Sequence, residues 1–461
     1  MNSIMIGRSN MSRPLRAIAH VLPIVTLMIS TFTAQAQEVR EITFNEAIEI
    51  ALERNVTIKR AENNLKLQEI TVQSERADFL PNLNFNTGAS RNFGLQFDQT
   101  TGSLVNASSD GFNYSASSGL NIFNGFADVA SLEGARAVLE SQEANFARTQ
   151  QQVVFNVVSN YLNVILAEEN IRIRQEDVES QQSLLEQIEE FVRVGQRAVS
   201  DLYQQQATAA SSEALLLTAE SNFESSKTRL IQVLQVDPLA NYAFPAPAAE
   251  DIPTNLRAYD PNELVRAAFE RRPDLKAQEF LIRASESNIK AAKAGYLPTL
   301  GMSFGAGSSY TSNSPFDFSD QMTNNRSERV SLSLSVPLFN RLNVKRGIQS
   351  SKVQYSNALL DMENLQQSVA IEVRQAYLDY QTAVKRLEVT EKSLRAADQA
   401  FQVEQERYNV GASTLVELTQ SNSRYIDAAS QRAQAVFQFH FQHRLIEYYQ
   451  GSLDPTQPLF N

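Results

Sequence analysis

Residues 330–338 read VSLSLSVPL, with serine alternating with apolar residues over the first seven positions. Strict alternation is typical of a β-strand that has one apolar face and one polar face. We predict that this strand covers residues 328–340. The same alternation marks three further predicted strands, at residues 82–98, 111–124 and 299–310. The chain is therefore predicted to contain four strands, each with one apolar face.

The apolar face of these strands has two interpretations. One is an antiparallel sheet that covers a core and turns its other side to water, and the other is a sheet that spans a membrane. A transmembrane barrel needs strands of about 10 residues with apolar side chains outward, which these segments supply. The polar stretches 99–110 and 311–327 fit loops outside the membrane. The lipid-facing residues expected in the second pair of strands are Leu300, Met302, Phe304, Val330, Leu332, Leu334 and Val336.

Four strands are too few to close a barrel, because the smallest bacterial barrels use about 8 strands. An open sheet edge in lipid would leave backbone groups without hydrogen-bond partners. Several chains must therefore share one barrel. Its inner face would carry Asn, Ser, Gly and Thr, so we expect the lumen to be a water-filled pore.

The sequence contains an internal duplication, with an offset of about 216 residues between the two copies. The segment NEAIEIALER at 45–54 returns as NELVRAAFER at 262–271, and ADFLPNL at 77–83 returns as AGYLPTL at 294–300. We divide the chain by residue number into these parts: signal peptide 1–36, first repeat 37–245, linker 246–258, second repeat 259–453 and C-terminal tail 454–461. Each repeat is predicted to contain helix, strand, strand, very long helix and helix.

The two very long helices are predicted at residues 125–194 and 343–409. The first stretch contains no proline, and a helix of 70 residues would be roughly 105 Å long at about 1.5 Å per residue. Its apolar residues recur every three or four positions, as a coiled-coil seam requires. The seam residues are Val154, Val158, Tyr161 and Ile165 in the first helix and Val369, Val373, Tyr377, Tyr380, Val384 and Leu387 in the second. We expect a hollow cylinder of paired helices.

The first 36 residues indicate export, because Arg8, Arg13 and Arg16 precede an apolar stretch that ends in Ala34-Gln35-Ala36. The stretch is short for a membrane anchor, which is the competing interpretation. Removing these three arginines leaves 38 basic residues against 52 acidic ones, a net charge of −14 that opposes binding to nucleic acid.

Composition and motifs give no sign of catalysis. There is no cysteine, which excludes disulfides and thiol chemistry. His440 and His443 have no third ligand nearby in the sequence, so we expect core packing rather than a metal site. No phosphate-binding or dinucleotide-binding glycine motif and no nucleophile elbow occurs. We predict no cofactor and no enzymatic activity.

From residue 38 to residue 453 the doubled series resembles the TolC-like outer membrane efflux proteins. The most specific features are the two Leu-Pro helix-to-strand junctions, the two Phe-Asn strand-to-helix junctions and RYNVG at 407–411. The resemblance implies a mainly α fold with a transmembrane β-barrel portion, in which a homotrimer builds one twelve-stranded barrel above a periplasmic helical tunnel. It also implies an outer-membrane location, contact with lipid, and partnership with a periplasmic adaptor and an inner-membrane pump.

The resemblance also assigns roles at the far end of the tunnel. The turns Val194-Gly195 and Val410-Gly411 would receive the adaptor, although each also fits an ordinary helix end with a left-handed glycine. Tyr408 would link neighbouring helices in the closed state. The gate and constriction candidates are Tyr408, Glu417, Gln420 and Asp201.

Three of these assignments carry alternatives. The arginine that partners the tyrosine in the family is replaced by Ser413. Carboxylates in a narrow ring would raise one another's pKa, but Glu417 also fits a solvated helical position, and Gln420 stands where the family has a second acid. Asp201 is the equivalent of Glu417 in the first repeat and fits a helix cap as well.

The predicted function is a passive conduit for small molecules or proteins, in a tripartite efflux system or a type I secretion system, driven by a pump elsewhere. The alternative is a periplasmic coiled-coil adaptor or scaffold, which would share the long helices but would not need four amphipathic strands. A periplasmic hydrolase comes third. The exported substrate is not indicated by the sequence.

Overall fold

The computed structural model of the chain describes residues 39–98, 101–245, 252 and 254–453. The predicted signal peptide 1–36, the tail 454–461 and most of the linker 246–258 lie outside the described residues. Within the described part of the chain, no helix combines the length and the apolar character needed to cross a membrane.

The main helices of the two halves match in length and order. The first half contains β1 (Arg40–Glu41), α1 (Phe44–Arg54), α2 (Val56–Ala77), β2 (Asn84–Asp98), β3 (Ser103–Phe123), α3 (Ala127–Arg193), α4 (Val199–Leu234) and β4 (Tyr242–Ala243). The second half contains α5 (Pro261–Arg271), α6 (Pro273–Ala294), β5 (Thr299–Thr311), α7 (Phe318–Asn324), β6 (Ser327–Ser335), α8 (Asn343–Asn409) and α9 (Leu415–Gln450). The four main helices of each half have 11, 22, 67 and 36 residues in the same order, so the duplication in sequence is a duplication in structure.

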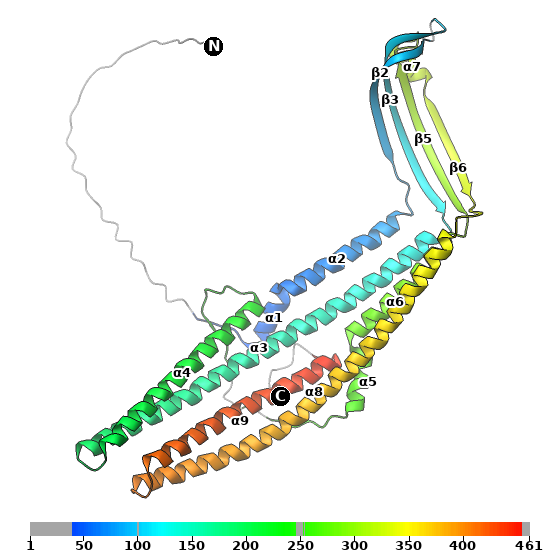
Figure 1. Ribbon diagram of the computed structural model, residues 1–461. Coiled ribbons are helices and arrows are strands. Elements are labelled where there is room, and N and C mark those ends of the chain that lie inside the picture. The colour runs from blue at the N-terminus through cyan, green and yellow to red at the C-terminus, as the bar shows by residue number, and fades with distance from the viewer. Residues whose placement is uncertain (1–38, 99–100, 246–251, 253, 454–461) are drawn as a thin grey trace, which may run out of the picture.

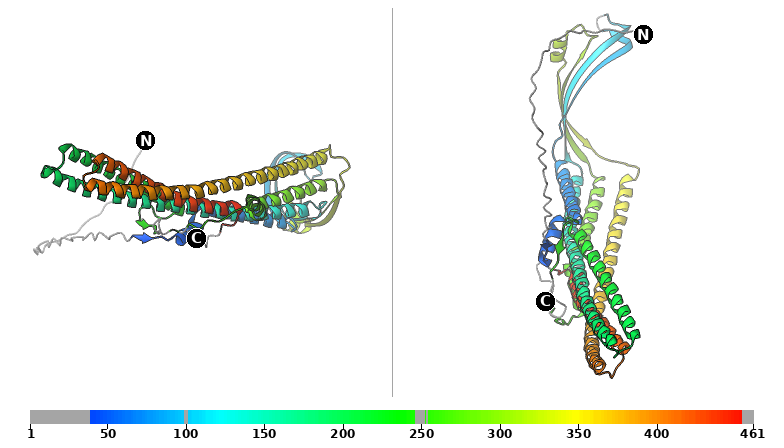
Figure 2. Two further views of the ribbon diagram at one scale, coloured as in Figure 1. Left: turned by 90° about the horizontal axis from the view of Figure 1, so that it is seen from below. Right: turned by 90° about the vertical axis from the view of Figure 1, so that its left-hand side faces the viewer.

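The long helices α3 and α8 run the length of the helical part, about 100 Å each at about 1.5 Å per residue. The shorter helices α2 and α4 lie one after the other along α3, and α6 and α9 lie along α8, so that the molecule is slender in every view (Figures 1 and 2). Each long helix starts directly after a left-handed residue, Phe126 or Leu342. This sharp backbone turn separates it from the strand before it.

The main hydrophobic core lies where the short helices meet the long ones at mid-length. The predicted seam residues Val154, Val158, Tyr161, Val369 and Val373 are all buried there. The hydroxyl of Tyr161 donates to the carbonyl oxygens of Ile42 and Pro245 at 3.2 and 3.0 Å, which fixes the segments around the β1–β4 pair against α3. The coiled-coil prediction is confirmed for these positions.

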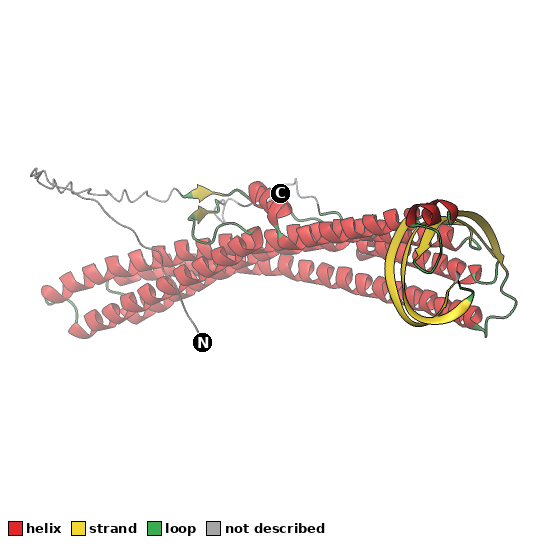
Figure 3. Ribbon diagram, turned by 90° about the horizontal axis from the view of Figure 1, so that it is seen from above, coloured by secondary structure: helices red, strands yellow, loops and turns green. Residues whose placement is uncertain are grey.

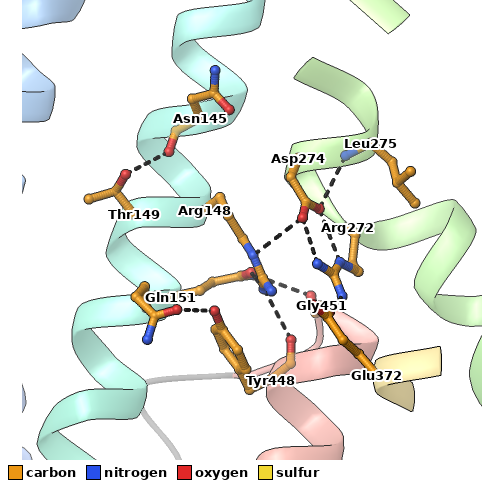
Figure 4. Close-up of polar contacts among 11 residues, drawn as sticks. Asn145, Arg148, Thr149, Gln151, Arg272, Asp274, Leu275, Glu372, Tyr448 and Gly451 are labelled. Carbon is orange, nitrogen blue, oxygen red and sulfur yellow. Dashed lines mark hydrogen bonds and ion pairs between the residues drawn. The ribbon is translucent and has the colours of Figure 1, made fainter. Parts of the chain in front are cut away.

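A polar junction crosses the same region (Figure 4). The buried Arg272 before α6 donates to Asp274 and to Glu372 of α8, with shortest distances of 2.6 and 2.7 Å. Arg148 of α3 lies 3.8 Å from Asp274 and donates to the carbonyl oxygen of Tyr448 on α9 at 3.2 Å. Burial alone would raise the pKa of Asp274, but the hydrogen bonds from Arg272 outweigh it and the pKa is lowered. The junction therefore ties α3, α6, α8 and α9 together with a carboxylate that stays ionised.

The main sheet is antiparallel with strand order β2-β3-β5-β6, which leaves β2 and β6 as its edges. Seen from above, its strands form an arc at one end of the long helices (Figure 3). Direct pairing sets Val330 opposite Phe304, Leu332 opposite Met302 and Leu334 opposite Leu300. Residues directly opposite in a ladder share a face. These six side chains therefore form one apolar surface.

Three details of the strand prediction are wrong. β3 begins at Ser103 rather than at residue 111, so most of the predicted loop 99–110 is strand. The ladder continues because β2 runs on to Asp98, opposite Ser103, and Arg91 forms a 2.5 Å ion pair with Asp110 opposite it.

The second predicted loop, 311–327, contains helix α7, which Asp317 caps by accepting from the Asp320 backbone N–H at 2.8 Å. The last predicted strand ends at Ser335 rather than at residue 340, so Val336 lies just outside the sheet. β5 starts at Thr299, which pairs with Ser335, and Pro337 has no N–H to offer a ladder. Val336 is exposed but belongs to the connection to α8.

Candidate functional site: the tip of the helical hairpins

Two hairpins, α3–α4 and α8–α9, end side by side at the pole opposite the sheet (Figures 1 and 2). Each ends with a glycine in the left-handed region, Gly195 or Gly411, both with φ of 75°. The backbone N–H of each glycine donates to a carbonyl three residues earlier at 3.0 Å, and the next N–H donates five residues back at 2.8 Å. This pattern closes a helix end and needs a residue without Cβ strain at that position.

The valines before these glycines are exposed, Val194 by 59% and Val410 by 76%. No atom lies within 4 Å of a Cβ built at Gly195 or Gly411. The ordinary helix-end interpretation is therefore confirmed, and the two turns also present an apolar knob next to open space. Docking of an adaptor on these turns stays a prediction.

Tyr408 lies buried between the hairpins rather than exposed on one of them. Its ring is 3% accessible and belongs to a cluster with Ile188 of α3 and Leu415 and Leu418 of α9. The guanidinium carbon of Arg197, from the turn of the other hairpin, lies 4.6 Å from the ring centroid. Burial raises the pKa of Tyr408, so the phenol remains neutral. Tyr408 thus joins the two repeats of one chain.

Arg197 was missed in the sequence analysis. It occupies the position in the first repeat that Ser413 occupies in the second, since both stand two residues after the turn glycine. A cation near Tyr408 is therefore present, supplied by the other turn. The internal duplication was the signal for it, because Arg197 stands 216 positions before Ser413.

Glu417 is held in the cap of α9. Its carboxylate accepts from the Thr414 backbone N–H at 2.9 Å and from the Ser413 and Thr414 hydroxyls at 3.0 Å, while the Thr414 hydroxyl accepts from the Glu417 N–H at 3.3 Å. The backbone donor and the two hydroxyls lower the pKa of Glu417. Within one chain the shift is opposite to the one expected for a ring of carboxylates, because donors surround this one.

The other two constriction candidates differ from Glu417. Asp201 stands in the first turn of α4, but the cap residue there is Ala198 and no side chain caps the helix. The interpretation of Asp201 as a cap is therefore wrong. Gln420 is exposed one turn after Glu417. In one chain these residues stand near the tip, and a ring would require further copies.

A buried polar cluster, which we call the latch, joins the hairpins above the tip. Asp177 of α3 is 5% accessible and accepts from Ser212 of α4 at 2.8 Å, from Asn422 of α9 at 2.7 Å and from Gln181 at 3.3 Å. The Gln205 amide donates to the side-chain oxygen of Gln181 at 2.9 Å. The latch thus holds one carboxylate among neutral donors, and Asn422 is its contact with the second hairpin.

A cavity of about 100 Å³ lies between the latch and Tyr408, lined among others by Gln181, Leu184, Tyr408, Thr419 and Asn422. The hydroxyls of Tyr408 and Thr419 are buried there without a protein partner among the described residues. A polar cavity of this size suits ordered water. The contact between the hairpins is therefore partly polar and encloses a cavity. The latch was also missed in the sequence analysis, because a single Asp within a polar helix carries no local signal.

We expect acid to loosen the first turn of α9 through Glu417. Because the pKa is lowered in the folded chain, the stabilisation by the cap is complete above the usual value of 4.5 and is lost as pH falls through the lowered pKa. Amide hydrogen exchange of residues 415–418, corrected for the intrinsic pH dependence, measures this loss. Glu417→Gln keeps an acceptor and should remove the pH dependence, whereas Thr414→Ala should weaken the turn at every pH by about 1 kcal/mol.

The architecture defines an elongated helical protein with an amphipathic sheet at one pole and paired hairpins at the other. Comparison with known proteins gives the family. A sequence model described as outer membrane efflux protein matches residues 47–235 and 264–454, which is most of both repeats. The chain belongs to the outer membrane efflux protein family.

Individual relatives agree with this assignment. The chain is 25% identical to Protein CyaE of Bordetella pertussis over 399 residues, covering 85% of this chain and 80% of that protein. It is 23% identical to the pyoverdine export outer membrane protein OpmQ of Pseudomonas putida over 405 residues, covering 84% and 81%. The crystal structure of the Campylobacter jejuni CmeC outer membrane channel has the same fold, with a TM-score of 0.76 and 16% identity over 90% of this chain and 87% of that one.

Proposed function

We propose that this chain is the outer-membrane channel of an export system and works as a homotrimer. The observation that carries the proposal is the four-stranded sheet. The outer edges of β2 and β6 have no strand partner among the described residues, and one face of the sheet is apolar and exposed. Three copies joined edge to edge would make a twelve-stranded barrel and satisfy the backbone groups at both edges. The small polar residues of the other face would then line a water-filled pore.

The helices supply a second contact surface for the same assembly. α8 carries an exposed apolar stripe away from α9, and its residues are Val353, Leu360, Ile371, Leu378, Val389 and Val403. Spacings of 7, 11 and 14 residues keep them on one face of a helix. This stripe fits a helix of the next copy, so that six hairpins close a tunnel below the barrel.

Export needs a source of energy, which partner proteins would supply. The family consists of channels, and we assign the driving force to an inner-membrane pump linked by a periplasmic adaptor. The adaptor would dock on the exposed turns around Val194 and Val410, and Glu417 and Gln420 would stand at the narrowest point of the tunnel. The alternative function, a periplasmic scaffold, does not account for the exposed apolar face of the sheet.

The proposal is tested by fractionation and by chain association. The processed protein should separate with outer membranes, require detergent for solubility and migrate as a trimer until heated, as closed barrels do. A detergent-independent monomer that insertion assays cannot place in a bilayer would contradict both the barrel and the pore.

Replacing both turn glycines, Gly195→Trp with Gly411→Trp, is expected to abolish export without lowering the yield of trimer. A non-glycine residue at φ of 75° costs about 1–2 kcal/mol and opens the turn, while no neighbouring atom is displaced inside the hairpin. The measurement is drug or substrate accumulation in cells together with trimer yield. Gly347→Trp on α8, also with open space at its Cβ, is the matched control and should export normally. Unimpaired export by the double variant would remove the turns from adaptor docking.

A further inference from the structure

The polar face of the sheet carries one charged residue where all four strands pair. Arg329 of β6 lies opposite Gly305 of β5, and Gly305 lies opposite Ser117 of β3. Opposed residues share a face, so Arg329 is on the face away from Val330 and Phe304. Its neighbours on this face are small and neutral, among them Ser117, Ser303, Gly305 and Ser331.

Arg329 has no ion-pair partner among the residues that the structure describes, and its side chain is exposed. The adjacent Glu328 belongs to the opposite face, where Arg326 binds it. Across the ladder stand Gly305 and Ser117, which are too small to cover a guanidinium. The charge of Arg329 is therefore left free to meet a solute.

Closing the barrel would not neutralise this charge. β6 is an edge strand, so in the proposed trimer it pairs with β2 of a second copy. The polar face of β2 carries Asn84, Asn86, Gly88 and Ser90 along the half of the strand next to the helices, and its one carboxylate, Asp98, lies at the far end of the strand, at the hairpin. Each copy would then add one unpaired guanidinium to the same level of the lumen.

We propose that Arg329 forms a ring of positive charge in the pore and binds the carboxylate or phosphate groups of molecules in transit. This inference rests on the proposed trimeric barrel. A guanidinium offers paired N–H donors that match both groups, and rings of charged side chains set the ion preference of pores. The barrel section would thus favour anions, although the chain carries a net charge of −11.

The test uses purified full-length trimer in planar bilayers, with a KCl gradient and with citrate added on the side of the β2–β3 hairpin. Citrate is expected to reduce the current of the wild-type channel. Arg329→Ser removes one guanidinium from each copy and should weaken this block by at least about tenfold, which is the effect of losing a single charge-assisted contact. Arg329→Glu should also shift the reversal potential toward potassium. Arg326→Ser with Glu328→Ser, which removes a paired cation together with its carboxylate from the opposite face, is the control and should behave as wild type.

The experiment distinguishes failure of the inference about Arg329 from failure of the proposed channel function. Channels of normal conductance whose reversal potential and citrate block are the same in Arg329→Glu and wild type would overturn the inference alone. Absence of any channel from folded wild-type trimer would instead overturn the proposed function. Yield and heat-dependent migration of each variant show that the barrel has assembled before the currents are compared.

Discussion

Leu332→Asp combined with Leu334→Asp is expected to prevent assembly in the outer membrane while leaving the helices folded. Both leucines are 67% exposed in the single chain, on the apolar face of edge strand β6. In a lipid-facing position each carboxylate costs up to roughly 2 kcal/mol near the bilayer centre, and each copy in a trimer carries two of them. The measurement is membrane fractionation with the heat-dependent shift of the trimer, alongside circular dichroism of the purified chain.

The control lies on the same strand. Ser331→Asp with Ser333→Asp introduces the same charge one position away, on the polar face that we assign to the lumen. This variant should assemble, because its carboxylates meet water. Equal assembly of both variants, or failure of both, would contradict the assignment of the apolar face to lipid.

Much of the fold was predictable because its elements follow strong periodic patterns. The boundaries predicted for the second long helix, 343–409, match α8, and the first differs from α3 by two residues at its start and one at its end. Helices of 67 residues carry a repeating apolar seam over many turns, so the signal accumulates. The paired junctions at Pro81 and Pro298 also marked where helix gives way to strand.

The ends of the strands were less predictable. Residues 103–110 resemble a loop in composition, yet they pair with β2 because the partner strand continues beside them. Pairing of this kind depends on a neighbour, and alternation within one segment does not reveal it. Val336 was misplaced for the converse reason, since its apolar alternation continues after the partner strand has ended.

The site at the tip was predictable only in part. The turn glycines and Tyr408 follow from local motifs, whereas the contacts of Tyr408 with Arg197 and of Asp177 with Asn422 join residues more than 200 positions apart. Such contacts depend on how the two hairpins lie against each other. A buried carboxylate in a polar helix looks like a solvated one until the packing is known.

Asn422→Asp is expected to separate the two hairpins at the tip. The variant places a second carboxylate at the 2.7 Å contact with Asp177, where two ionised groups in a buried site repel strongly. Breaking a buried polar pair in this way costs about 3–5 kcal/mol, which is enough to displace α9 from α3 near the tip. Because the chain has no cysteine, spin labels at introduced cysteines at Gln196 and Ala412 can report the distance between the turns.

Two further measurements test the latch: the distance between the turns as a function of pH, and the same distance after Asp177 and Asn422 are exchanged. In Asn422→Asp the two carboxylates can share one proton at low pH and restore the contact, so the turns should move apart as pH rises. Asp177→Asn with Asn422→Asp returns one carboxylate and one amide to the latch and should restore the wild-type distance. Ser423→Asp, exposed on the next position of α9, adds the same charge outside the latch and should change nothing. An unchanged distance in Asn422→Asp at high pH would show that the latch does not hold the hairpins together.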